Sequence, residues 1–171
     1  CHPNWRTGKA GIQVSGDTAP LVLEVPTEEQ MHELGIRLGS LLIAGDVLSL
    51  NGPLGAGKTT LTRGIGEGVM AEGNVSSPTF LIARTHSTKS GIPFHHIDAY
   101  RLSSAAELDD LDIDYAGSIS VIEWGSGFTQ GLTESLLEIN IERDLETDLR
   151  TMSITGSGRF ANPAEFFGET N

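Results

Sequence analysis

A glycine-rich loop that ends in a lysine and a threonine is the segment with the clearest chemistry in this chain. Residues 52–59 read GPLGAGKT, which fits the pattern G-x-x-x-x-G-K-[ST]. Glycines in this pattern let the backbone curl until several N–H groups face one anion, and the following helix adds its positive end. Lys58 would then supply a charge to the β and γ phosphates, and Thr59 a hydroxyl to Mg²⁺. The loop predicts binding of a magnesium-bound nucleoside triphosphate, and we expect ATP.

Two acidic residues follow strands that would lie beside this loop. A phosphate loop needs carboxylates at neighbouring strand ends, to hold the magnesium shell and to orient the attacking water or hydroxyl. Asp98 and Glu123 are each the first acid after a largely apolar strand. We predict that Glu123 supports Mg²⁺ and that Asp98 positions or deprotonates the nucleophile, although the reverse division stays open. Lys58, Asp98 and Glu123 are thus the predicted catalytic groups, and Thr59 and Glu123 the predicted metal ligands.

Three other residues have positions that suggest a role beside the nucleotide. Thr79 lies between the helix after the loop and the next strand, where many P-loop proteins sense the γ-phosphate; a turn containing Pro78 is the alternative. Trp124 either flanks the nucleotide or a partner, or forms the edge of the core. Arg101 either steadies transition-state charge or a partner, or is simply exposed.

Two adjacent histidines precede Asp98. His95 and His96 lie within one predicted strand, so their rings should point to opposite faces of the sheet. No cysteine and no suitably spaced third histidine completes a zinc site with them. We expect both to be structural, with the alternative that one of them lines the site.

Apolar periodicity predicts the elements that position these residues. Thr27 and Gln30 have the spacing of a helix-capping pair, and a short loop joins two strands as an antiparallel hairpin, which argues against a wholly parallel sheet. The predicted fold is α/β, a three-layer P-loop NTPase-like fold with a mixed parallel and antiparallel central sheet. The expected strands are 21–25, 46–51, 80–86, 92–97, 118–123, 136–141 and 149–154, and the expected helices are 28–43, 59–69 and 103–111.

The two ends of the chain differ in composition from its middle. We expect residues 1–19 to be a flexible extension, residues 20–155 to form one P-loop ATPase domain, and residues 156–171 to be a C-terminal tail. The tail contains Phe160, Phe166 and Phe167, so it is either disordered or docked through its aromatic rings.

Charge and cysteine content limit the partners. The formal net charge is -12, which repels phosphate backbones, so we expect no binding to DNA and only indirect contact with RNA, through a basic partner. The single cysteine, Cys1, permits no intrachain disulfide, as fits a reducing cytoplasm. No apolar run approaches the roughly 20 residues that span a bilayer. We therefore expect a cytoplasmic protein without membrane contact.

Four sequence blocks together resemble the bacterial tRNA threonylcarbamoyladenosine biosynthesis ATPase family, TsaE or YjeE, over residues 22–143. They are GPLGAGKTT at 52–60, SSPTF at 76–80, HHIDAYRL at 95–102 and IEW at 122–124. The resemblance implies an ATPase that is weak alone and that acts with a TsaD and TsaB type enzyme pair, which forms threonylcarbamoyladenosine at position 37 of ANN-decoding tRNAs. The chain departs from the family pattern at two places. Residues 125–127 are Gly-Ser-Gly where the family often has an acidic residue, and residues 107–115 lack the usual glycine between their acidic residues.

The resemblance also implies the residues that contact the nucleotide. Lys58 and Thr59 would serve phosphate and Mg²⁺, Asp98 and Glu123 would be the active-site acids, and Trp124 would accompany Glu123. The predicted nucleotide-binding set is Gly52, Pro53, Leu54, Gly55, Ala56, Gly57, Lys58, Thr59, Thr60, Thr79 and Trp124.

Other classes of P-loop protein stay open as alternatives. A small-molecule kinase would need an arginine-rich lid, but the chain has only 11 Lys plus Arg and no basic cluster after the core strands. A guanine-nucleotide switch would show N-K-x-D and D-x-x-G, whereas Asp98 is followed by Ala99, Tyr100 and Arg101. A non-catalytic nucleotide-dependent binding module is the third alternative.

Overall fold

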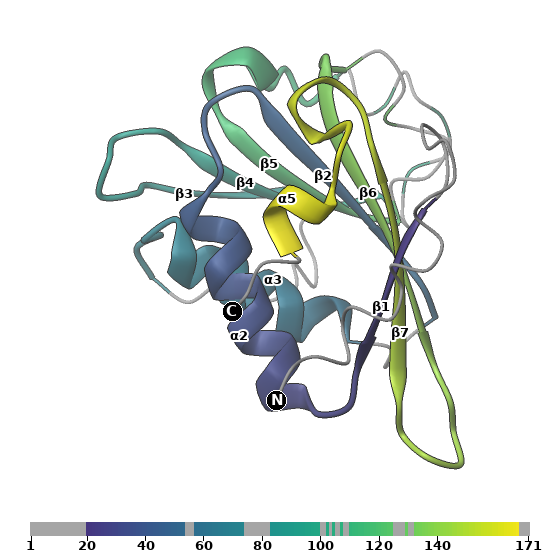
Figure 1. Ribbon diagram of the computed structural model, residues 1–171. Helices are drawn as coiled ribbons and strands as arrows, with labels where there is room; N and C mark the ends of the chain where they lie inside the picture. The colour runs from purple at the N-terminus through teal and green to yellow at the C-terminus, as the bar shows by residue number, and fades with distance from the viewer. Residues whose placement is uncertain are drawn as a thin grey trace.

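The computed structural model describes residues 20–53, 57–73, 83–99, 102, 104, 107, 110–124, 129 and 132–167. This part of the chain forms seven strands and two helices longer than one turn (Figure 1). They are β1 (Leu21–Val25), α2 (Glu28–Ser40), β2 (Asp46–Asn51), α3 (Lys58–Gly68), β3 (Ala83–His86), β4 (Phe94–Asp98), β5 (Ile119–Glu123), β6 (Ser135–Arg143) and β7 (Arg150–Gly156), with the short η3 (Tyr115–Gly117), η4 (Gly158–Phe160) and α5 (Ala164–Phe167). Within these residues no helix is long and apolar enough to cross a membrane.

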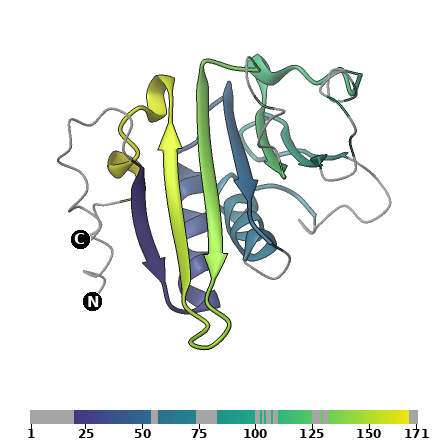
Figure 2. The ribbon, with the colours of Figure 1, turned by 90° about the vertical axis from the view of Figure 1, so that its right-hand side faces the viewer.

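The seven strands form one mixed sheet in the order β1-β7-β6-β2-β5-β4-β3. Strand β2 is parallel to both β5 and β6, and β4 is parallel to β5. The edge pairs β3–β4 and β1–β7, and the β6–β7 hairpin, are antiparallel. Figure 2 shows β1, β7 and β6 side by side in front of the helices. The mixed α/β fold and the antiparallel hairpin before Asp98 are therefore confirmed.

Helix α2 begins as its sequence predicts but ends earlier. The Thr27 hydroxyl accepts a hydrogen bond from the Gln30 N–H (3.1 Å) and caps the first turn. The helix ends at Ser40, so the expectation that it reaches residue 43 is wrong. The reason is a tight turn into β2: Gly45 has a φ of 100°, and the Asp46 carboxylate accepts a hydrogen bond from the Ile43 N–H (2.8 Å).

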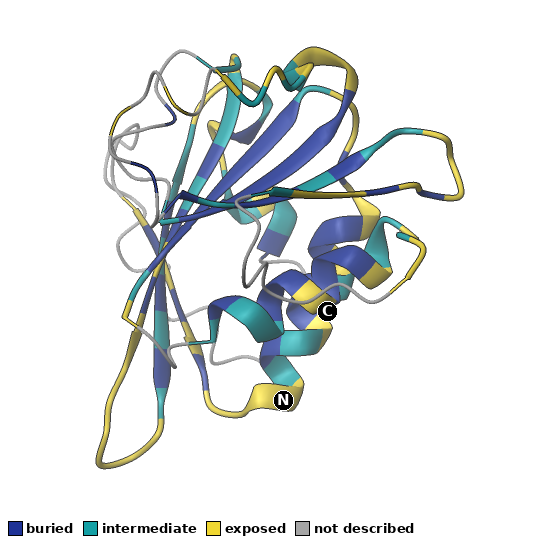
Figure 3. Ribbon diagram, turned by 180° about the vertical axis from the view of Figure 1, so that it is seen from behind, coloured by how far each residue is buried: buried dark blue, intermediate teal, exposed yellow. Residues whose placement is uncertain are grey.

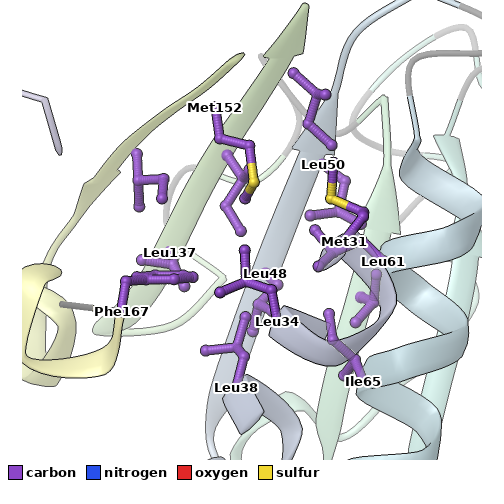
Figure 4. Packing of buried hydrophobic residues seen from close by; sticks show 14 of the residues in the cluster. Met31, Leu34, Leu38, Leu48, Leu50, Leu61, Ile65, Leu137, Met152 and Phe167 are labelled. Atoms are coloured by element: carbon purple, nitrogen blue, oxygen red, sulfur yellow. The ribbon is translucent and has the colours of Figure 1, made fainter. Parts of the chain in front are cut away.

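Packed side chains cover both faces of the sheet. On one face α2 and α3 lay their apolar stripes, including Met31, Leu34, Leu61 and Ile65, on the strands, as Figure 4 shows. A smaller cluster, which includes Ile97, lies on the opposite face. Successive side chains of a strand point to opposite faces of the sheet, so β2 contributes to both clusters. Figure 3 shows the resulting burial of the central strands and the exposed tip of the β6–β7 hairpin.

Helices α2 and α3 approach closely because glycines line their contact. A Cβ added to Gly64 would stand 2.3 Å from the His32 carbonyl oxygen, and one added to Gly35 would stand 2.5 Å from that of Leu61. Gly39 and Gly68 repeat the arrangement one turn later. Since these obstacles are backbone atoms, only glycine fits at this distance. The contact determines where the first turn of α3 lies, and with it Lys58.

The aromatic residues after β7 dock on the main core. Phe160 and Phe167 are fully buried there, and the rings of Phe160 and Phe166 lie 4.9 Å apart between centroids. Of the two alternatives left open by the sequence, docking therefore holds for residues 158–167. The division of the chain at residues 20 and 155 stays a prediction, and residues 1–19 lie outside the described part.

Candidate nucleotide-binding site

The predicted phosphate loop connects β2 to α3. Of residues 52–59 the structure describes Gly52, Pro53 and 57–59, whereas 54–56 lie outside the described part. Gly57 precedes α3 with a φ of 119°, and no side chain of the described residues caps this helix end. The N–H groups of the first turn are therefore not satisfied by a capping side chain, and donors of this kind bind anions at helix N-termini.

The Lys58 side chain folds back over the loop. Its Nζ donates hydrogen bonds to the carbonyl oxygens of Gly52 (2.5 Å) and Pro53 (3.0 Å), and lies 4.3 Å from the centroid of the Trp124 ring. Burial lowers the pKa of the Lys58 ammonium, and the negative charges of Glu123 and Asp98 partly offset that lowering. The two carboxylates are thus close enough to act on Lys58.

Asp98 and Glu123 stand side by side at the ends of neighbouring strands. They are register partners in the parallel pair β4–β5, so their side chains share one face. The Oε2 atom of Glu123 lies 2.7 Å from Nε2 of His96. His95 lies on the other face, where its Nδ1 is 2.9 Å from the Thr85 hydroxyl. The two histidines therefore point apart as expected, and one of them contacts a predicted site residue.

Trp124 turns sharply out of β5 directly after Glu123. Its φ is 63°, a left-handed conformation that is rare for a bulky residue. The Trp124 N–H donates to the Leu50 carbonyl oxygen (2.7 Å), which ties this turn to the end of β2. The turn brings the indole ring over Lys58, so the chain holds an uncommon backbone conformation where the predicted site lies.

The remaining predicted site residues are only partly described by the structure. Thr59 and Thr60 lie half-buried in the first turn of α3, directly after Lys58. Thr79 and Arg101 lie outside the described residues. The structure therefore brings together Lys58, Asp98, Glu123 and Trp124 at one end of the parallel strands, and their roles stay predictions.

Comparison with known proteins gives a family match over most of the chain. Residues 25–152 match the model of a family described as threonylcarbamoyl adenosine biosynthesis protein TsaE. The chain belongs to the TsaE family. A relative from Mycobacterium tuberculosis, named tRNA threonylcarbamoyladenosine biosynthesis protein TsaE, is 45% identical over 75% of this chain and 78% of its own length. One of the same name from Streptomyces coelicolor is 57% identical over 57% of this chain and 68% of its own length.

A solved structure agrees with the family match. The crystal structure of YdiB from Bacillus subtilis superposes with a TM-score of 0.64 and 26% sequence identity, and the match covers 85% of this chain and 91% of that chain. The mixed seven-stranded sheet is therefore a fold that this TsaE-family chain shares with a solved protein.

Magnesium is the metal whose requirements the predicted donors meet. Among the described residues, no group of three or more His, Cys, Asp or Glu side chains is arranged to hold an ion. Mg²⁺ bound with a nucleotide needs only one or two protein oxygens, since phosphates and waters fill the other positions. A hydroxyl at Thr59 and a carboxylate at Glu123, beside an uncapped helix end, fit that requirement.

Sequence reasoning missed Arg150, which lies against the end of the phosphate loop. Its side chain is buried, and its Cδ and Nε each lie 3.6 Å from where a Cβ of Gly57 would stand. The guanidinium donates to the Asp148 carbonyl oxygen (3.3 Å) and lies 3.6 Å from the Glu28 carboxylate. No local pattern marks Arg150, because β7 reaches the loop only through the pairing of the sheet.

Proposed function

We propose that this TsaE-family chain is an ATPase subunit required to form threonylcarbamoyladenosine at position 37 of ANN-decoding tRNAs in the cytoplasm. It would bind Mg-ATP on the loop at 52–60 and hydrolyse the nucleotide in complex with the modification enzymes. The observation that carries the proposal is the buried Lys58, which lies against the loop carbonyls within electrostatic reach of both Glu123 and Asp98.

Each residue has a separate task in this proposal. Mg-ATP supplies the transferable phosphoryl group and the charge of the ion when it is bound. Lys58 would exchange its carbonyl partners for phosphate oxygens, which the N–H groups at the start of α3 would also bind. Thr59 and Glu123 offer oxygens to the ion, while Asp98 orients the attacking water and accepts its proton. Trp124 covers the lysine and reduces its access to water.

The partner we propose is a TsaD and TsaB type enzyme pair. The relatives bear the name of tRNA threonylcarbamoyladenosine biosynthesis proteins, and the net charge of -12 makes direct tRNA binding unfavourable. The chain would therefore act on the protein complex and leave the RNA to its partners.

Phosphate release measured with and without the purified partner pair tests this function. We expect slow release by the chain alone and faster release in the complex. Asp98→Asn and Glu123→Gln should each lose the stimulated rate, whereas Glu142→Gln, on the exposed surface of β6, should keep it. Full stimulated turnover by both site variants would contradict the proposal.

The same assay separates the alternatives. ADP formation that depends on a small phosphate acceptor and not on the partner pair, without matching release of phosphate, would indicate a kinase. Nucleotide-dependent capture of the pair without phosphate release in any mixture would indicate a binding module. Failure to capture the pair with either ATP or ADP would contradict the proposed partner.

A further inference from the structure

The buried contact between His96 and Glu123 has no part in the function proposed above. The His96 side chain is fully buried and that of Glu123 is 7% exposed, with 2.7 Å between Nε2 and Oε2. A hydrogen bond this short between a ring nitrogen and a carboxylate is of the stronger, charge-assisted kind. Its seclusion from water adds to its strength.

The sheet places this contact directly beneath the predicted acids. His96 precedes Asp98 by two residues on β4, so both side chains lie on the face that also carries Glu123. On the same face, Val121 is the register partner of His96 on β5, and Phe94 lies two residues before His96 on β4. The side chains of Val121 and Phe94 are fully buried. The imidazole thus separates the apolar core from the site and approaches Glu123 from the core side.

The surroundings of the ring indicate which nitrogen carries the proton. Nδ1 of His96 is buried and has no hydrogen-bond partner among the described residues. Nε2 faces the carboxylate, which only accepts hydrogen bonds when ionised. The arrangement therefore assigns the proton to Nε2, which donates to Oε2 and leaves Oε1 of Glu123 for another ligand.

We propose that His96 is a positioning residue, whose Nε2–H holds the Glu123 carboxylate in the orientation that supports nucleotide-bound Mg²⁺. This inference rests on the proposed function. Groups that hydrogen-bond a metal-binding side chain typically change metal affinity or activity by about 10–100-fold when they are removed. His96 should therefore determine how much Mg²⁺ the chain needs to bind nucleotide tightly.

Two amide variants give a matched test. The side-chain nitrogen of Gln reaches the place of Nε2, whereas that of Asn reaches only the place of Nδ1, so His96→Gln restores the donor and His96→Asn does not. Both variants bury one amide in the same pocket. His96→Leu removes the donor altogether, and His95→Gln changes the neighbouring residue on the opposite face.

The measurement is the binding of a fluorescent ADP analogue to the full chain, in EDTA and over a Mg²⁺ titration. For His96→Asn and His96→Leu we expect the half-saturating Mg²⁺ concentration to rise about 10–100-fold. For His96→Gln and His95→Gln it should stay within about threefold of wild type. Binding in EDTA should be equal in all variants, because the phosphate loop is unchanged.

Two further readouts do not depend on the stability of one variant. In a Glu123→Gln background, His96→Leu should add no further shift, because the carboxylate on which His96 acts is gone. Long-range ¹H–¹⁵N spectra of the nucleotide-free chain should show His96 with a protonated Nε2 and a bare Nδ1. If His96→Leu does not fold, the Mg²⁺ titrations of His96→Gln and His96→Asn still test the positioning role.

The outcomes separate this inference from the function on which it rests. Equal shifts in His96→Gln and His96→Asn, no shift in either His96→Asn or His96→Leu, or a proton on Nδ1 would each overturn it. Lower stability with an unchanged Mg²⁺ requirement would also overturn it, since His96 would then be purely structural. If wild type bound no nucleotide at all, the proposed function itself would fail, and this inference with it.

Discussion

Apart from the edge strand β3, the sheet has two halves that bury different kinds of side chain. The site half, strands β2, β5 and β4, buries Ser49, Asn51, His96, Ser120 and Glu123 among its apolar residues. The aliphatic half, strands β6, β7 and β1, buries Leu, Ile, Val and Met side chains, with Arg150 as the polar exception at the start of β7. Only the site half ends at the predicted phosphate loop and its acids.

The difference has an energetic meaning. A buried polar atom costs free energy unless it is hydrogen-bonded, and Ser120 Oγ and His96 Nδ1 have no such partner among the described residues. The aliphatic half has few such costs, and it also receives the rings of Phe160 and Phe167. Both halves bury apolar side chains, but only the site half adds buried polar groups beside the predicted site. We therefore infer that substitutions in the aliphatic half should affect mainly stability, and those of polar residues in the site half mainly chemistry.

The largest effect on stability should come from Phe160, which packs at the end of the aliphatic half. Phe160→Ala removes a fully buried ring and should lower the free energy of unfolding by about 3–5 kcal/mol, while nucleotide affinity of the folded fraction stays unchanged. Urea unfolding and nucleotide titration measure the two quantities. Leu145→Ala, which changes a residue 88% exposed at the tip of the β6–β7 hairpin, should alter stability by less than about 0.5 kcal/mol. Equal effects of the two variants would contradict the docking of this ring.

The counterpart in the site half is Glu123. Glu123→Gln keeps the shape of the side chain but removes the charge that supports the ion, so stimulated phosphate release should fall by about 10²–10³-fold. Its urea midpoint should move far less than that of Phe160→Ala, because the amide oxygen still accepts from His96. A large loss of stability with normal turnover would reverse the assignment of the two halves.

A substitution at Gly64 should affect both stability and nucleotide binding. An added methyl group would meet the His32 carbonyl oxygen at 2.3 Å, so α2 and α3 must move apart. Overpacking of this kind costs about 1–3 kcal/mol and outweighs the helix propensity that alanine gains, at most about 1 kcal/mol. Because α3 carries Lys58, Gly64→Ala should weaken nucleotide binding as well as stability. Exposed Arg63→Ala, one position earlier, is the control, and a stabilised Gly64→Ala would be the contrary result.

The smallest effect should come from His95, on the face of β4 opposite His96. Burial lowers the pKa of His95, and the charge of Asp114 opposes that lowering. The folded chain therefore binds fewer protons than the unfolded chain between the lowered pKa and 6.5, and its stability falls as the pH drops through that window. Urea midpoints at about pH 8 and about pH 5 should differ less for His95→Gln than for wild type. If the urea midpoint of His95→Gln depended on pH as that of wild type does, His95 would not cause the loss of stability at low pH.

Much of the site-bearing segment could be predicted because its signals are local. Strand, loop and helix follow one another over residues 46–68, and the boundaries of β1 and β2 match the prediction at both ends. Asp98 and Glu123 could be found because each ends an apolar strand, and parallel neighbours bring such ends together. The alternation of β4 predicted that the two histidines diverge.

Other features depend on contacts that no local pattern contains. Apolar Leu41 and Leu42 extend the spacing of α2 in the sequence, yet the helix ends at Ser40 because the chain turns at Gly45 towards β2. Leu41 is exposed, whereas Leu42 stays buried in the core. The tail was ambiguous because aromatic residues occur in both docked and disordered segments. Arg150 reaches the loop only because β7 pairs between β1 and β6.

By itself the sequence predicted the phosphate loop, the helix that follows it and the acids at two strand ends, because backbone geometry and side-chain alternation act over a few residues. Only the tertiary structure decided that Lys58 lies over the Trp124 ring and that His96, one of two adjacent histidines, contacts Glu123. These contacts join residues far apart in the chain. They depend on strand order, register and the close packing of α2 on α3, which follow from burying the whole core at once.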